Sequence, residues 1–349
     1  MGWMGQATNG GAAGYFAGAV PAVERDLRPT CTITIDTEED FDWSDPTEGT
    51  DQSTAHLHRI GTLQNIFAAY GAIPAYLVTY PVLNDPDAVR TLRREHERGR
   101  CSLGLQLHPW VTPPLLHRRD AKESFAGYLE ANFEERKLRT LATRFNEAFG
   151  CAPRTYRAGR YGFGPHSAAL LEELGIEVDT SVAPRTDFSE EGGPDYTGFD
   201  FTPFWFGQSR RLLGLPLCRS TFGLGGAAAP GLYRLAGGGR EGWSLAAGVV
   251  TWLRLAERVT LSPEGNDINA MMRLVRALLA RGQHVFPISF HSSSIAPGRN
   301  PYVRSARDMH VFYDRLSALL SFMADTVGAE FIALEDVPAR YAPPAMAGA

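Results

Sequence analysis

The stretch GLQLHPWVTPP, residues 104–114, alternates leucine with other residues and then reaches a histidine, a tryptophan and prolines. An alternation of period two predicts a β-strand. The prolines predict that this strand ends close to His108, because proline cannot donate a hydrogen bond to a neighbouring strand. A lone histidine at a strand end is more often a hydrogen-bonded structural residue than a ligand. The role of His108 therefore depends on what other segments bring to it.

Strand-like and helix-like segments alternate on both sides of this stretch. The alternation predicts a parallel α/β architecture, and a chain of 349 residues suits a barrel. We expect a flexible tail over residues 1–28, one barrel over 29–340 with a loop-rich insertion at 184–242, and a short tail over 341–349. Besides the opening stretch, the predicted strands cover 31–36, 73–82, 155–160, 176–182, 284–291 and 330–337. The predicted helices cover 54–71, 85–99, 128–149, 165–175, 266–282 and 305–326.

Composition excludes several classes of protein. The net charge of −5 gives no basis for binding nucleic acid or an anionic membrane surface. The four cysteines form no CxxC pair, which argues against a zinc knuckle and favours reduced thiols. No apolar run is long enough to span a bilayer, and no basic residue precedes the apolar stretch near the N-terminus, so we expect a cytoplasmic protein. Composition leaves the oligomeric state open.

The predicted strands end in polar residues. In a parallel barrel the carboxyl ends of the strands meet on one face, where active sites lie. We therefore expect a shared pocket in which a carboxylate serves as general base or metal ligand and an arginine fixes that carboxylate and lowers its pKa. Two histidines at the ends of two different strands are more strongly indicated as functional residues than either histidine alone. These strand-end residues are Asp36, His108, Arg157, Asp179 and His291.

Further candidates surround the strand ends. Glu38 is a second possible ligand or a solvated side chain, whereas Glu39, Asp40 and Asp42 are expected to form a solvated acidic loop. His56 and His58 lie two apart on a predicted helix, face different directions and are not expected to share a metal. Several aromatic residues lie beyond strand ends or in the insertion; they either pack in the core or bind substrate, since ring faces suit the apolar face of a sugar. These aromatic residues are Trp43, Trp110, Tyr161 and Trp205.

Taken in order, five stretches resemble the polysaccharide deacetylases with NodB-type homology domains, which are similar to carbohydrate esterase family 4. The likeness is greatest to the branch that acts in surface-glycan biosynthesis. It implies an irregular (β/α)7 barrel and a hydrolase that removes acetyl groups from N-acetylated sugars with the help of a divalent metal. The substrate implied is a carbohydrate. The stretches are TITIDTEEDFDW, SLGLQLHPWVTPP, TYRAGRYGFG, EVDTSVAP and ISFHSSSIAPGRNPYV.

The resemblance also implies roles for individual residues. Asp36 matches the catalytic base, Arg157 the arginine that pairs with it, and His291 the general acid. His108 lies in the histidine motif that holds metal, and with Asp36 and Glu38 it forms the implied ligand set.

Two departures from the family pattern bear on the metal. Thr37 replaces the second carboxylate of the first motif, and Gln106 replaces the first histidine of an HxH motif. An amide oxygen is a poor ligand for Zn²⁺ and is tolerated by harder ions. Either a divalent ion binds weakly through His108, a carboxylate and waters, or the site works without metal.

Two alternatives follow from these departures. One is a hydrolase of C–N bonds in a small non-sugar amide or cyclic ureide, which could be independent of metal. The other is a non-catalytic homologue that binds glycans. A test of acetate release separates both from a deacetylase.

Overall fold

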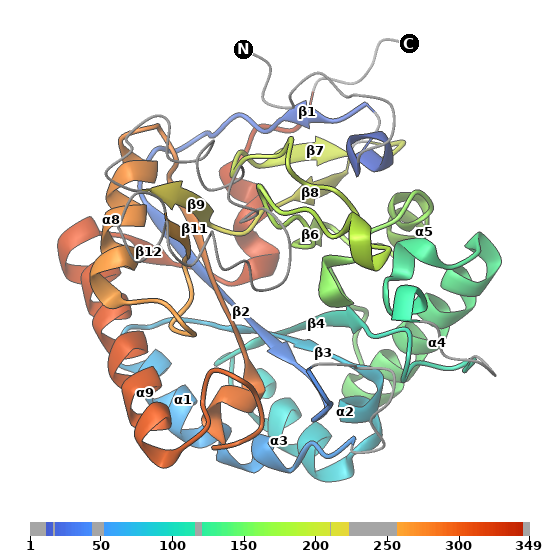
Figure 1. The fold of residues 1–349 in the computed structure, drawn as a ribbon, viewed down its shortest axis with the longest axis horizontal. Coiled ribbons are helices and arrows are strands. Elements are labelled where there is room, and N and C mark those ends of the chain that lie inside the picture. The colour runs from blue at the N-terminus through green and yellow to red at the C-terminus, as the bar shows by residue number, and fades with distance from the viewer. Residues whose placement is uncertain are drawn as a thin grey trace.

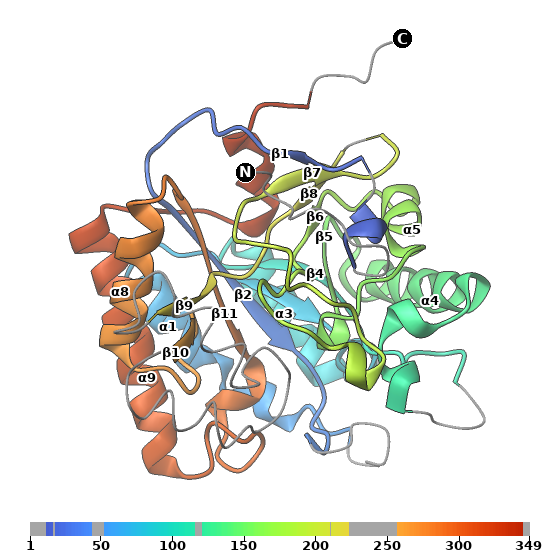
Figure 2. The ribbon, with the colours of Figure 1, turned by 45° about the horizontal axis from the view of Figure 1, so that its top comes forward.

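The computed structural model describes residues 12–16, 18–43, 52–115, 121–209, 211–222 and 257–344. A mostly parallel sheet runs through its centre, with helices packed outside it (Figures 1 and 2). Seven parallel strands lie in the order β11-β2-β3-β4-β5-β6-β8, and β7 and β1 continue the sheet beyond β8 through antiparallel pairs. The short strand β12 also pairs with β2. The strands are β1 Val20–Pro21, β2 Thr30–Thr37, β3 Ala75–Val78, β4 Ser102–Leu107, β5 Thr155–Ala158, β6 Val178–Asp179, β7 Phe204–Phe206, β8 Leu212–Gly214, β9 Arg219–Phe222, β10 Glu257–Thr260, β11 Val285–His291 and β12 Glu330–Phe331.

The antiparallel pair of β9 and β10 closes the sheet into an irregular barrel. On one side the Leu217 N–H donates to the carbonyl of Val182, just after β6, at 3.0 Å. On the other side the Ser289 N–H of β11 donates to the carbonyl of Leu261, just after β10, at 3.2 Å. Backbone hydrogen bonds therefore run around the ring from β11 through β2 to β6 and back. The barrel predicted from the sequence is confirmed.

The composition of the strands explains why they lie at the centre. All eight residues of β2, TCTITIDT, are buried, and six of the seven residues of β11 are buried. Such nearly continuous burial is typical of parallel strands covered on both faces, and β-branched residues suit them. The carboxyl ends of β2 and β11 lie side by side, because Asp36 pairs in register with His291.

The helices begin and end at recognisable residues. The Asp85 carboxylate accepts a hydrogen bond from the Asp87 N–H at 2.9 Å and so caps α3, which starts with Pro86. Gly150, with φ of 75°, ends α4. The α-helices are α1 Ile60–Ala68, α2 Tyr80–Asn84, α3 Pro86–Glu97, α4 Ala131–Phe149, α5 Ser167–Glu173, α8 Ile268–Leu279 and α9 Ala306–Ser321. A π-helical turn follows at Phe322–Val327, and 3₁₀ helices occupy Ala12–Phe16, Ala55–Arg59, Ala121–Ser124, Ala126–Tyr128, Gly159–Tyr161, Ser189–Glu191, Ser292–Ile295 and Leu334–Arg340.

Some predicted boundaries differ from the structure. The strand predicted over 73–82 stops at Val78, because the chain turns into α2 with a proline in its first turn. The strand predicted over 330–337 covers only its first two residues and continues as a 3₁₀ helix. The strand predicted over 176–182 is reduced to β6.

The segment predicted as a flexible N-terminal tail is ordered where the structure describes it. Phe16 is buried against the aromatic rings of Phe163 and Phe206, and β1 pairs with β7. The predicted insertion contributes β7, β8 and β9 in its described part, so it is not made only of loops. Residues 1–11, 223–242 and 345–349 of the predicted tails and insertion lie outside the described residues.

Two other expectations concern the whole chain. All four cysteines are free thiols, as predicted. Within the described ranges, no helix has the length and apolar character needed to cross a membrane.

Candidate functional site

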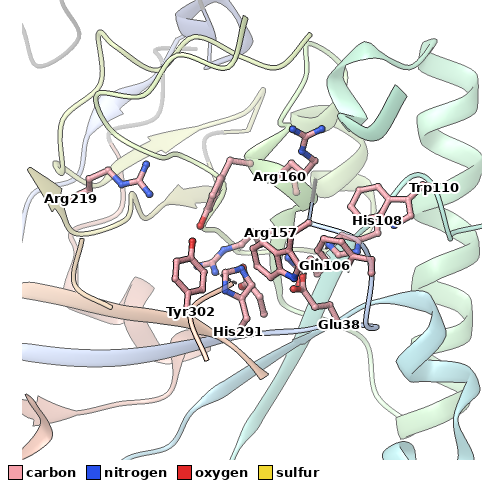
Figure 3. Close-up of a pocket in the computed structure, with 14 residues that line it drawn as sticks. Glu38, Gln106, His108, Trp110, Arg157, Arg160, Arg219, His291 and Tyr302 are labelled. Carbon is pink, nitrogen blue, oxygen red and sulfur yellow. Dashed lines mark hydrogen bonds and ion pairs between the residues drawn. The ribbon is translucent and has the colours of Figure 1, made fainter. Parts of the chain in front are cut away.

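A cavity of about 180 Å³ opens where the carboxyl ends of the strands meet (Figure 3). Four of the five polar strand-end residues line it, contributed by β2, β5, β11 and the turn after β4. The cavity is lined by Asp36, Glu38, Phe41, Trp43, Gln106, His108, Trp110, Arg157, Ala158, Arg160, Tyr161, Arg219, His291 and Tyr302. The structure thus brings together residues that are up to 266 positions apart, the separation between residues 36 and 302.

Asp36 and Arg157 form a fully buried ion pair in this cavity. The Arg157 Nη1 donates to Asp36 Oδ1 and also to Ser289 Oγ, which lies 2.8 Å away. Its Nη2 donates to Thr34 Oγ1 at 2.8 Å, and its Nε donates to Thr180 Oγ1 at 3.0 Å. Because three hydroxyls accept hydrogen bonds from further N–H groups of Arg157, the guanidinium is fixed in place and holds the Asp36 carboxylate in one orientation.

His291 faces the other oxygen of Asp36. Its Nε2 lies 3.6 Å from Asp36 Oδ2, while its Nδ1 lies 2.8 Å from Glu264 Oε2. The backbone N–H of His291 donates to Glu264 Oε1 at 2.9 Å, and the hydroxyl of Ser294 donates to that same oxygen. Burial by itself lowers the pKa of His291, but the surrounding carboxylates, Glu264 foremost, outweigh it and raise that pKa to about 10. The ring is therefore an oriented imidazolium.

His108 lies between two carboxylates. Its Nδ1 is 2.9 Å from Glu39 Oε1, and its Nε2 is 3.4 Å from Glu38 Oε2. The Thr79 hydroxyl donates to the second oxygen of Glu39 at 2.8 Å, and the ring of Trp110 stacks on His108 with centroids 4.1 Å apart. Burial opposes the charged ring, yet the carboxylates, Glu39 first, raise the pKa of His108 to about 9. Both nitrogens of His108 are thus engaged by acids.

The acidic residues after β2 differ from the expected solvated loop. Glu39 is buried and supports His108, as described above. Asp40 is buried as well and lies 3.4 Å from Nδ1 of His56 and 3.1 Å from Nη1 of Arg299. Asp42 is exposed, as predicted.

The two remaining histidine candidates lie apart. His56 is buried and pairs through Nε2 with the Ser292 hydroxyl at 2.8 Å, whereas His58 is exposed. They do not share a site, which agrees with the expectation from their spacing.

Two sequence-predicted candidates lie away from the cavity. Asp179 folds onto its own turn, where the Ser181 hydroxyl donates to Oδ1 at 2.5 Å and the Ser181 N–H donates to Oδ2 at 3.2 Å. Trp205, a candidate for substrate binding, is not part of the cavity lining. Its strand β7 pairs with β1 at the far end of the sheet, and its indole N–H donates to the carbonyl of Ala342 at 2.9 Å.

Several residues of the site were missed by reasoning from the sequence. Glu264 lies in the turn between β10 and α8, within the stretch LSPEGND, which reads as an ordinary loop. Arg160, Arg219 and Tyr302 line the cavity from segments without a strand-end signal. The aromatic candidates Trp43, Trp110 and Tyr161 line it as expected.

The predicted metal ligands are only partly gathered. In the described ranges no three residues among histidine, cysteine, aspartate and glutamate form a cluster that could hold a metal ion. Asp36 is engaged by Arg157, which leaves Glu38 and His108. Their facing atoms are 3.4 Å apart, which is about the separation of two ligands that each lie about 2.1 Å from one tetrahedral ion. Oε1 of Glu38 and Oε1 of Gln106 are buried without a hydrogen-bond partner.

These atoms fit a divalent ion of a particular kind. One imidazole, one carboxylate and one amide oxygen form a donor set richer in oxygen than typical zinc sites. The two oxygens without partners are groups that an ion would satisfy. Such a set suits an ion that prefers oxygen over one that prefers nitrogen or sulfur.

Comparison with known proteins identifies the fold. No family model and no curated protein matches the sequence. A "putative polysaccharide deacetylase" from Mycobacterium smegmatis superposes with a TM-score of 0.52 and 15% identity, covering 95% of this chain and 99% of that one. A "probable Polysaccharide deacetylase" from Pseudomonas aeruginosa PAO1 gives 0.50 and 12%, covering 89% and 90%. The chain has the polysaccharide deacetylase fold. The resemblance found in the sequence is therefore confirmed at the level of the fold.

The polysaccharide deacetylase fold also occurs in a neighbour with a different name. Puue allantoinase superposes with a TM-score of 0.50 and 14% identity, covering 89% of each chain. The fold alone therefore leaves the substrate to be argued from the cavity.

Proposed function

We propose that the protein hydrolyses the acetamide group of an N-acetylated sugar. The observation that carries this proposal is the pairing of two oppositely charged groups across one cavity. Asp36 is held by Arg157, and His291 is held by Glu264, with 3.6 Å between the two functional groups. A fixed carboxylate facing a fixed imidazolium provides the base and the acid that amide hydrolysis requires.

The steps follow from these positions. Asp36 accepts a proton from a water molecule as that water attacks the acetyl carbonyl. Arg157 holds one oxygen of this carboxylate, and the other oxygen lies on the side of His291. The C–N bond of the tetrahedral intermediate then breaks, and His291 donates its Nε2 proton to the departing nitrogen. The products are acetate and a free amino sugar, and each acid–base role contributes roughly 10²–10⁴-fold to the rate.

The turn after β5 supports the developing negative charge. Arg160 and Tyr161 have φ of 53° and 59°, a left-handed conformation that is unusual for residues other than glycine. This conformation folds the chain back at the cavity, where Ala158, Arg160 and Tyr161 are part of the lining. We assign the stabilisation of the oxyanion to backbone N–H groups of this turn.

The polar residues on the opposite side would hold a metal ion. Glu38, His108 and the amide oxygen of Gln106 would be its ligands, and a divalent ion held there would supply Lewis-acid polarisation of the acetyl carbonyl. The neighbouring carboxylates raise the pKa of His108, so His108 would have to lose a proton before it could serve as a ligand.

Aromatic rings form the sugar-binding part of the cavity. Trp43 lies edge-on to His291 with centroids 4.8 Å apart, and it stacks on Phe41 at 5.2 Å. Tyr302 lies 5.9 Å from Trp43. Flat apolar surfaces beside the acid–base pair suit a pyranose whose acetamide points inward.

The cytoplasmic location expected from the sequence stays a prediction.

Release of acetate from N-acetylated amino-sugar oligosaccharides tests the proposal, and a cyclic ureide such as allantoin serves as the competing substrate. We expect acetate release, and we expect Asp36→Asn to reduce kcat by roughly 10²–10⁴-fold at temperatures where the variant is folded. Its melting temperature should also fall, because Arg157 loses its charged partner. Asp314→Asn, the same chemical change at an exposed position of α9, is the matched control. Ureide hydrolysis without acetate release would replace this proposal with the second function, hydrolysis of a C–N bond in a small non-sugar amide or ureide.

A further inference from the structure

Lys137 of α4 is a buried cation outside the acid–base pairs. Its Nζ donates to three backbone carbonyls: that of Pro109 at 2.8 Å, that of Thr112 at 2.5 Å and that of Pro114 at 2.6 Å. A lysine ammonium has three N–H donors and no acceptor, so these contacts satisfy it completely. Burial lowers the pKa of Lys137 to about 8, so placing a charge here is costly unless its hydrogen bonds compensate.

The three carbonyls belong to one short segment, residues 109–114, which we call the proline segment. It contains three prolines, which lack an N–H group and so cannot form the hydrogen bonds that would hold a turn or a strand together. Two backbone bonds tie its middle to the end of β4, since the Val111 and Thr112 N–H groups donate to the carbonyl of His108. The ammonium of Lys137 supplies three further N–H donors, all from its single Nζ atom.

The proline segment carries one wall of the cavity. Trp110 lies within it, and its ring stacks on His108 with an angle of 26° between the planes (Figure 3). Glu39 holds His108 through a ring nitrogen, and Trp110 holds the same ring through its face. The contact with Glu39 acts in the plane of the His108 ring, and the contact with Trp110 acts on its face. A shift of the proline segment therefore removes the stacking contact of Trp110.

We propose that Lys137 is a positioning residue, which fixes the proline segment and thereby keeps the Trp110 ring against His108 in the wall of the cavity. Lys137 itself does not line the cavity. The kinetic part of this inference rests on the proposed deacetylase function, whereas the structural part does not.

Lys137→Met tests this inference by removing the three donors while keeping an unbranched side chain. The first measurement is the fluorescence of Trp110, obtained as the difference between each protein and its Trp110→Phe counterpart. We expect the Trp110 emission of Lys137→Met to shift to longer wavelength, because the indole separates from His108 and becomes hydrated. The second measurement is steady-state kinetics, in which kcat falls roughly 10–100-fold while KM changes less, as expected when a site is misplaced by about 1 Å.

Phe145→Ala is the matched control. Phe145 is buried on the same helix, about 12 Å further along its axis, and its loss destabilises the protein without touching the proline segment. It should lower the melting temperature and leave both the Trp110 emission and kcat unchanged. If Lys137→Met fails to fold, Lys137→Gln, which keeps two N–H donors, takes its place, and we expect an intermediate shift of emission.

The outcomes separate the two proposals. A shifted Trp110 emission in a protein that never releases acetate supports the positioning role of Lys137 and refutes the deacetylase function. A lowered melting temperature with the emission and kcat of the parent protein, as for Phe145→Ala, refutes the positioning role and leaves Lys137 with a purely structural one.

Discussion

The contacts of Glu264 make it the most informative position to change. Its carboxylate accepts hydrogen bonds from the ring and the backbone of His291 and from the hydroxyl of Ser294. Glu264→Gln keeps the size and shape of the side chain but removes its charge. It also replaces one acceptor oxygen with an NH₂ group, which cannot accept the proton of the His291 ring.

The size of the effect follows from the contact that is lost. A hydrogen bond between charged groups contributes about 1.5–3 kcal/mol, and each 1.4 kcal/mol corresponds to about a tenfold change in rate. The hydrogen bond from the His291 ring to Glu264 is 2.8 Å long and largely buried, so we apply this whole energy range to its loss. We therefore expect Glu264→Gln to lower kcat roughly 10–100-fold, with a smaller change in KM.

The pH profile gives an independent readout. His291 donates a proton in the proposed mechanism, so activity on the alkaline side is lost as pH rises through its pKa, which is raised to about 10. Without the charge of Glu264, burial pulls that pKa down. The alkaline limb of kcat should therefore move to lower pH in Glu264→Gln. The assay is acetate release between pH 6 and about 10.5, a range that spans this pKa.

Two controls define what would refute this reasoning. Glu264→Asp keeps the charge and should preserve the position of the alkaline limb even if kcat falls. Glu147→Gln, an exposed position on α4, should change nothing. A Glu264→Gln enzyme that keeps the parent kcat and the parent pH profile would show that His291 is not the general acid.

Three further predictions concern other parts of the molecule. Gln106→His supplies the imidazole that the HxH pattern lacks and should tighten Zn²⁺ binding in titration calorimetry; an unchanged Kd would exclude Gln106 as a ligand. Gly159→Ala places a Cβ 2.5 Å from Cδ2 of His108 and should lower both kcat and the melting temperature, at a cost of about 1–3 kcal/mol. Burial raises the pKa of Glu134 from 4.5 to about 7, so its contribution to stability is greatest below pH 4.5 and falls by up to about 3 kcal/mol as pH rises through 7. Thermal unfolding of Glu134→Gln should therefore show a gain over the parent protein that grows from pH 5 to pH 8, and a constant difference would contradict it.

The central strands could be predicted because their signal is local. The predicted strands over 31–36 and 284–291 agree with β2 and β11 to within a residue at each end. β2 is rich in β-branched residues, β11 is mostly apolar, and both are buried along nearly their whole length, as is typical of parallel strands covered on two faces. The rule that strand ends converge then placed Asp36 and His291 together without further information. The strand predicted over 73–82 extends too far. Its last residues form α2, a helix with proline in its first turn, and their apolar side chains suit a strand as well as a helix.

The supporting acids could not be predicted because their position depends on distant contacts. Glu264 reaches His291 because the chain after β10 is bonded to β11, where the Ser289 N–H donates to the carbonyl of Leu261. Nothing in the residues next to Glu264 encodes that bond. In the sequence, Glu39 resembles the other acids that were expected to be solvated. It points inward to His108 only because of the path that the chain takes after β2. A string of acids after a strand that ends at a barrel mouth is a usable signal for such buried partners.

The charges of the site are explained by the cost of burying them. A buried ion is tolerated when a partner of opposite sign and hydrogen bonds compensate for lost hydration. Arg157, His291 and His108 each meet this condition through a different acid: Asp36, Glu264 and Glu39 respectively. These pairings leave the second oxygen of Asp36 and the carboxylate of Glu38 facing the cavity. The supporting acids Glu264 and Glu39 thus raise the pKa values of His291 and His108. In the proposed mechanism the two cavity-facing carboxylates are then left to act on a water, a substrate or an ion.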